Sequence, residues 1–135
     1  MSENWVADIA ELHDHYGFTN KFDELEPEML KEYLQFRIKF LQEELDEMKS
    51  ATEADDVIDA LIDLCVVAIG TLDAFNVASN EAWDRVHEAN MNKEPGIKAS
   101  RPNPFGLPDL IKPVGWIAPD HKDIAKRSNF KKFKL

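Results

Sequence analysis

Residues 40–70 carry the pattern that decides the fold: Phe40-Leu-Gln-Glu-Glu-Leu-Asp-Glu-Met-Lys49, a short polar link, and Asp55-Asp-Val-Ile-Asp-Ala-Leu-Ile-Asp-Leu-Cys-Val-Val-Ala-Ile-Gly70. Apolar residues recur at helical spacing in both segments, which predicts two helices joined by a turn. Both segments also carry carboxylates at positions where a purely structural helix would place apolar residues. We therefore expect a helical hairpin whose acidic side chains face one another.

The acidic residues of each predicted helix share one face. Because an α-helix advances about 100° per residue, Glu44 and Glu47 lie on the same side of the first helix. Asp59 and Asp63 lie on one stripe of the second helix in the same way. They are the only charged residues between positions 57 and 72, and the rest of that segment is almost wholly apolar, which is typical of a buried helix.

Carboxylates inside a helical core need a compensating charge. Moving an isolated carboxylate into a low-dielectric interior costs several kcal/mol or more. No lysine or arginine lies between Lys49 and Arg85, so the compensation comes from elsewhere in the chain or from a metal ion. Oxygen ligands without histidine or cysteine favour Mg²⁺ or Mn²⁺ over Zn²⁺. The pattern predicts a carboxylate-lined divalent-metal site, with a solvated acidic helix face as the alternative.

Length and composition bound the class of protein. A chain of 135 residues with 44% apolar residues is long enough for one globular domain with a core of its own. The net charge of −10 argues against general nucleic-acid binding, which needs a basic surface. The single cysteine, Cys65, is expected in the core, and no signal peptide or membrane span is visible. We expect a cytoplasmic protein without a membrane partner.

The remaining helices follow from apolar spacing and from end signals. A polar link is expected at 18–26. Gly70 lies inside a predicted helix, where it either allows another helix to approach closely or simply lowers the stability of the helix. In the helix that starts at Pro27, the expected packing stripe is Leu30, Leu34, Ile38, Leu41, Leu45 and Met48. In the last helix Ala82, Trp83, Val86 and Ala89 are expected to face inward. Helices are predicted over residues 4–16, 27–50, 52–75 and 79–93.

The composition changes after residue 94. Six of the seven prolines lie at or beyond Pro95, so this segment cannot form a regular helix. We expect a helical domain over residues 1–94 and an extended, ordered arm over residues 95–135. The last 15 residues hold six Lys or Arg against one Asp, and this basic end is expected to be frayed.

The acidic pattern resembles that of the MazG-like all-α nucleoside triphosphate pyrophosphohydrolases. The resemblance rests on Glu43-Glu44-x-x-Glu47, Asp59-Ala-Leu-Ile-Asp63 and Ala68-Ile-Gly-Thr71, and covers about residues 5–93. The wider superfamily, which includes all-α dUTPases and phosphoribosyl-ATP pyrophosphohydrolase, has the pattern EExxE followed by ExxD. It implies an all-α fold with a four-helix core, and dimers or tetramers with active sites near subunit contacts.

The second half of that pattern departs from the family. Asp63 matches its aspartate, but Ala60 stands where the glutamate is expected, and Asp59 is one position earlier. Either Asp59 replaces the missing ligand, or one metal ion is held more loosely.

The resemblance implies hydrolysis of a nucleoside triphosphate, such as a dNTP, to a monophosphate and pyrophosphate. It implies that Mg²⁺, or Mn²⁺ as a substitute, is held by Glu44, Glu47 and Asp63 with Asp59, and that Glu43 is the general base. Asn90 and Lys93 match residues that contact substrate phosphates. Arg37, beside the acidic stripe, either joins them or forms a structural salt bridge. Trp5, His13 and Phe40 are candidates for a nucleobase pocket.

Two other functions compete with this hypothesis. One is a non-catalytic, acidic helical protein that dimerises through its apolar stripes and uses the proline-rich arm to bind a partner. Such an adaptor has no need for Asp59 and Asp63 inside an apolar helix. The other is a metal-dependent phosphohydrolase that releases inorganic phosphate.

Overall fold

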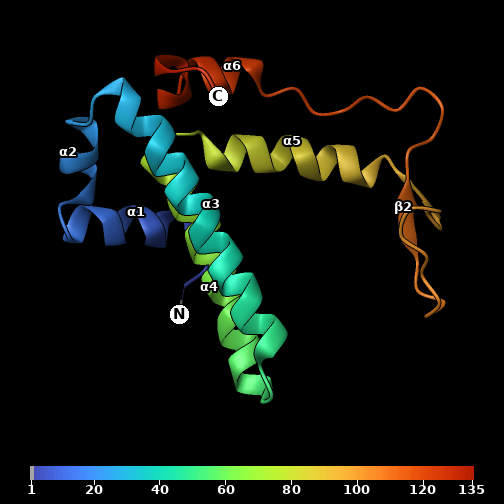
Figure 1. Ribbon diagram of the computed structural model, residues 1–135. Coiled ribbons are helices and arrows are strands. Elements are labelled where there is room, and N and C mark those ends of the chain that lie inside the picture. The colour runs from blue at the N-terminus through green and yellow to red at the C-terminus, as the bar shows by residue number, and fades with distance from the viewer. Residues whose placement is uncertain (1) are drawn as a thin grey trace. The chain divides into compact units, whose positions relative to one another are not determined.

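The computed structural model describes residues 2–135, which form six α-helices, one 3₁₀ helix and one two-stranded antiparallel ribbon (Figure 1). The all-α prediction is confirmed. The elements are α1 (Trp5–His15), α2 (Phe18–Asp23), α3 (Pro27–Ser50), α4 (Ala54–Ala74), α5 (Ser79–Met91), β1 (Glu94–Gly96), β2 (Asp109–Ile111), α6 (Lys122–Lys126) and η1 (Asn129–Lys132).

The chain divides into two compact units. The first holds the chain up to Ser79 together with Ile124–Leu135, and the second holds Asn80–Asp123. In the first unit α3 and α4 pack side by side as a hairpin, and α1 packs against α4 (Figure 1). The helix α1 begins at the cap Asn4, whose side-chain oxygen accepts a hydrogen bond of 3.1 Å from the backbone N–H of Ala7.

The predicted polar link at 18–26 is wrong, because residues 18–23 form the helix α2. Phe18, Phe22 and Leu25 recur at i, i+4 and i+7, so they lie on one helical face. Phe22 is buried against Leu30 and Phe75 in the aromatic core of the first unit. The apolar spacing outweighs the polar residues between these positions.

The prediction of a frayed C-terminal end is also wrong. Ser128 is only 1% exposed, and the ring of Phe130 stacks on that of Phe75 with 4.3 Å between centroids. The backbone N–H of Asn129 donates a hydrogen bond of 2.8 Å to the carbonyl of Phe75. Phe133 packs on the same ring. The segment therefore completes the core with its aromatic residues.

Truncation of Phe130 to alanine is expected to lower the free energy of unfolding by about 2 kcal/mol, because it removes a stacked, half-buried ring. Urea unfolding followed by circular dichroism measures the loss. Phe105, which is 78% exposed in the second unit, is the matched control, and Phe105→Ala should change stability by less than about 0.5 kcal/mol. Equal effects of the two substitutions would contradict the packing of Phe130.

In the second unit an extended segment returns along α5 (Figure 1). The strands β1 and β2 pair antiparallel, with Glu94 opposite Ile111. After β2 the chain turns at residues 113–116, where Gly115 has φ +81° and the backbone N–H of Trp116 donates to the carbonyl of Pro113. A positive φ at the third position of such a turn favours glycine. Residues 97–121 contain no helix, as the prolines predict, but the expectation of an extended arm to residue 135 is wrong, because Lys122–Lys126 and Asn129–Lys132 are helical.

Two predictions of inward-facing residues are wrong in this structure. Trp83 of α5 is 74% exposed, and Ala89 is the residue of its predicted inner face that is buried. Ile38 and Leu45 of α3 are 49% and 39% exposed, because the neighbouring stripe, which contains Arg37 and Glu44, faces α4 instead. Separately, no helix within residues 2–135 combines the length and apolarity needed to cross a membrane.

Candidate active site

Glu44 is the buried acidic residue of the α3–α4 hairpin. It lies on the face of α3 that packs against α4 and is only 8% exposed. Its Oε2 atom is buried and has no hydrogen-bond partner among the described residues. Leaving a charged oxygen buried and unpaired is costly, so this atom marks a place where a positive ligand would be stabilising.

The other three predicted ligands lie near Glu44. Burial raises the pKa of the Glu44 carboxyl above its usual value, and the negative charges of Glu47, Asp63 and Asp59 raise it further. Asp63 is half-buried, whereas Glu47 and Asp59 are exposed. The charges of Glu47, Asp63 and Asp59 therefore act on Glu44, while their joint binding of a metal ion stays a prediction.

The chemistry of this cluster fits a hard divalent cation. All of its donors are carboxylate oxygens, and a cation among them would relieve both the mutual repulsion and the unpaired Oε2 atom. In the part of the chain that the structure describes, no three acidic, histidine or cysteine side chains already stand in a metal-binding arrangement. Metal ligation by Glu44, Glu47, Asp59 and Asp63 stays a prediction.

Ala60, which stands where the family pattern has a glutamate, and the neighbouring Asp59 lie on different sides of α4. Ala60 is 3% exposed, so its position on α4 faces inward, whereas the preceding Asp59 is exposed. A glutamate at position 60 would start from the buried side of the helix. The side chain of Asp59 starts from the solvent side and acts on Glu44 through its charge.

Glu43, the predicted general base, is exposed on α3. It is adjacent in sequence to the buried Glu44, so the two carboxylates leave the helix about 100° apart. Solvent therefore reaches Glu43, which is a requirement for a group that activates water.

Arg37 connects α3 to α4. Its Nε–H donates to the hydroxyl of Thr71 at 3.0 Å and its Nη2–H to the carbonyl of Val67 at 2.9 Å. The guanidinium also lies over the ring of Phe40, 5.4 Å from the centroid. A Cβ atom at Gly70 would lie 2.8 Å from Nη2, so the glycine makes room for the Arg37 side chain rather than for the backbone of a neighbouring helix. Arg37 therefore hydrogen-bonds to a hydroxyl and a carbonyl of α4. It forms no salt bridge with a carboxylate within residues 2–135.

The candidates for a nucleobase pocket have different surroundings. Trp5 lines an apolar cavity of about 180 Å³ between α1 and α4, and neither His13 nor Phe40 is among the lining residues. His13 instead pairs with Asp73 at 2.6 Å and stacks on Phe18. Asp73 was missed by sequence reasoning, because its partner lies 60 positions away.

Asn90 and Lys93, the predicted phosphate contacts, belong to the second unit. Asn90 is exposed in the last turn of α5, and its carbonyl accepts a hydrogen bond from the backbone N–H of Lys93. Lys93 is half-buried, and its ammonium lies 5.2 Å from the ring centroid of Trp116. Trp116 is a contact that the sequence pattern did not indicate.

Comparison with known families shows that residues 16–90 match phosphoribosyl-ATP pyrophosphohydrolase. The chain belongs to the phosphoribosyl-ATP pyrophosphohydrolase family. The match covers α3, α4 and most of α5, and thus all four clustered carboxylates. A search of curated proteins finds no match to the chain. Membership of the phosphoribosyl-ATP pyrophosphohydrolase family agrees with the resemblance described above at the level of an all-α nucleotide pyrophosphohydrolase.

Proposed function

We propose that this protein is a Mg²⁺-dependent nucleoside triphosphate pyrophosphohydrolase that converts an NTP or dNTP to the monophosphate and pyrophosphate. The observation that carries the proposal is the unpaired, buried Oε2 atom of Glu44 within a cluster of three further carboxylates. A non-catalytic adaptor has no use for this arrangement, because the cluster opposes folding unless cations occupy it.

Glu44, Glu47 and Asp63 would hold the divalent cations, and Asp59 would add negative charge from the exposed side of α4. When bound, Mg²⁺ or Mn²⁺ neutralises phosphate charge and lowers the pKa of a coordinated water. The protein's part is to keep these oxygens together on two packed helices, so that little reorganisation is needed during the reaction.

Other side chains have roles in the same proposal. The solvent-facing carboxylate of Glu43 orients or deprotonates the attacking water. Asn90 and Lys93 contact the phosphates and stabilise negative charge on the leaving pyrophosphate. Arg37 holds α4 through Thr71 and Val67, and its Nη1 group makes no hydrogen bond within residues 2–135 and is free for a phosphate oxygen.

Phosphoribosyl-ATP is the second candidate substrate, because the matching family carries its name. Hydrolysis would release pyrophosphate from a triphosphate in either case. The distinction lies in the group attached to the nucleobase, which the catalytic carboxylates do not touch in this proposal.

The test is incubation of the full chain with Mg²⁺ and a panel of NTPs, dNTPs and phosphoribosyl-ATP, with products identified by phosphorus NMR. Pyrophosphate together with the corresponding monophosphate is the expected result. In ¹⁸O-labelled water the label should enter the monophosphate, because the attack is at the α-phosphorus. A diphosphate with inorganic phosphate would instead identify a phosphohydrolase, and no product from any nucleotide would favour the adaptor.

A further inference from the structure

The hydroxyl of Thr71 holds Arg37 in one orientation. Its single proton is donated to the carbonyl of Val67, one turn earlier on α4, at 2.7 Å. The hydroxyl oxygen therefore turns a lone pair toward the Nε–H of Arg37, which donates to it at 3.0 Å. The carbonyl of Val67 also accepts a hydrogen bond from Nη2–H of Arg37 at 2.9 Å. The Nε–H and Nη2–H groups, which share one edge of the guanidinium, are thus both bound to α4.

The other neighbours of Arg37 make this contact specific in shape. The guanidinium lies over the rings of Tyr33 and Phe40 on its own helix, 5.9 and 5.4 Å from their centroids. On α4 it occupies space that a side chain at Gly70 would fill. None of these groups carries a charge, so the contact between α3 and α4 depends on geometry and not on ion pairing.

The position of Arg37 against α4 also determines which acidic residues face one another. Arg37 lies seven residues before Glu44 on α3, and Gly70 lies seven residues after Asp63 on α4. Each interval is about two turns, or about 10.5 Å. Because α3 and α4 pack side by side in opposite directions (Figure 1), a contact that sets Arg37 against Gly70 also sets Glu44 level with Asp63. Burial raises the pKa of Glu44, and the charges of Glu47 and Asp63 raise it further, which agrees with this register.

We propose that Thr71 is a positioning residue for the metal site: through Arg37 it fixes the register of α3 against α4, and hence the separation of Glu44 and Asp63. This inference rests on the proposed function, which assigns the two carboxylates to Mg²⁺. Metal sites tolerate errors of only about 0.2 Å in ligand distance, whereas packed helices can shift by about 1–2 Å. A contact that resists such a shift strengthens metal binding, although it touches neither ligand.

Binding of Mn²⁺ alone to the full chain tests the inference, because without nucleotide the phosphate contact proposed for Arg37 plays no part. The electron paramagnetic resonance signal of free Mn²⁺ gives the dissociation constant. Thr71→Val keeps the shape of the side chain and the charge of the site but removes the lone pair. It should raise the dissociation constant about tenfold, as expected for a group that orients metal ligands. Thr71→Ser, which restores the hydroxyl, should bind Mn²⁺ as the wild type does.

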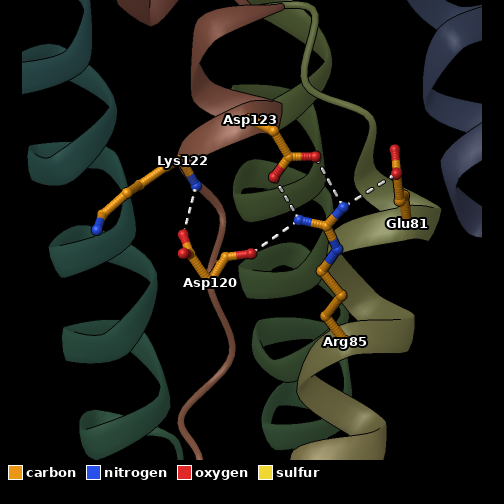
Figure 2. Close-up of polar contacts among 5 residues, drawn as sticks. All are labelled: Glu81, Arg85, Asp120, Lys122 and Asp123. Carbon is orange, nitrogen blue, oxygen red and sulfur yellow. Dashed lines mark hydrogen bonds and ion pairs between the residues drawn. The ribbon is translucent and has the colours of Figure 1, made fainter.

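Arg85→Lys is the matched control for Arg37→Lys. Arg85 donates hydrogen bonds of 2.6–3.1 Å to the carboxylates of Asp123 and Glu81 and to the carbonyl of Asp120 (Figure 2). It belongs to the second unit, which holds none of the four proposed ligands. A lysine cannot reproduce the fork of a guanidinium, so both variants lose hydrogen bonds. Only Arg37→Lys should weaken Mn²⁺ binding.

The outcomes separate this inference from the proposed function. Unchanged Mn²⁺ affinity of Thr71→Val, equal weakening by Thr71→Val and Thr71→Ser, or equal effects of the two arginine substitutions would overturn the role of Thr71 and leave the proposed function standing. Mn²⁺ binding that depends on Thr71, without pyrophosphate from any nucleotide, would support that role and overturn the proposed function. A wild type that binds no Mn²⁺ would overturn both. Circular dichroism at the assay temperature establishes that each variant is folded, so that a loss of affinity is not a loss of fold.

Discussion

Glu44→Gln is expected to lower kcat/KM by at least about 100-fold, because even the outer partners of metal ligands cost 10–100-fold when removed. The same substitution should leave the metal-free protein as stable as the wild type or more stable. Burial and three neighbouring carboxylates raise the pKa of Glu44, which means that its ionised form is disfavoured in the fold. A neutral glutamine of the same shape removes that penalty.

Thermal unfolding in EDTA and in Mg²⁺ measures the second half of this prediction. Cations that bind the native state raise its apparent stability, so wild type should gain stability with Mg²⁺ and Glu44→Gln should gain little. Asp46→Asn is the matched control, since Asp46 is an exposed acid of α3 that accepts a hydrogen bond from Gln42. Near-wild-type turnover of Glu44→Gln would remove Glu44 from the ligand set.

Asp63→Asn is expected to be far more damaging than Asp59→Asn. Asp63 is half-buried beside Glu44 and matches the aspartate of the family pattern, so its loss should also cost at least about 100-fold in kcat/KM. Asp59 is exposed and contributes through longer-range charge, so its loss should cost less than about 10-fold.

This pair of variants decides what replaces the glutamate missing at Ala60. Comparable losses in kcat/KM would mean that Asp59 serves as a ligand in its place. Steady-state rates at several Mg²⁺ concentrations distinguish a weakened metal site from a lost one, because a weakened site recovers activity at high Mg²⁺. Recovery by Asp59→Asn and none by Asp63→Asn is the expected result.

The predictions that held depend on local geometry. The helices α3 and α4, which pack against each other, follow from apolar spacing, whereas metal ligation by Glu44, Glu47, Asp59 and Asp63 stays a prediction. The extended part of the arm was predictable for a local reason too, because proline restricts the backbone at its own position, and the helix α6 begins only after the last proline, Pro119.

The predictions that failed, and the features that were missed, depend on partners far away in the sequence. Nothing near Phe130 indicates that Phe75 is its neighbour, so the basic end was expected to fray. The contacts of Arg37 with Val67 and Thr71 likewise require the register of α3 against α4. The ring of Trp116 lies close to Lys93 and Lys112 only because the arm reverses its direction.

The stacking of Phe130 on Phe75 has a consequence for the nascent chain. The ribosome must synthesise the whole of residues 80–123 after Phe75 before the ring that covers it exists. At about 5–20 residues per second, the interval is roughly 3–10 seconds. During that time the ring of Phe130 does not yet cover Phe75, and the exposed aromatic cluster is a surface that a chaperone can recognise.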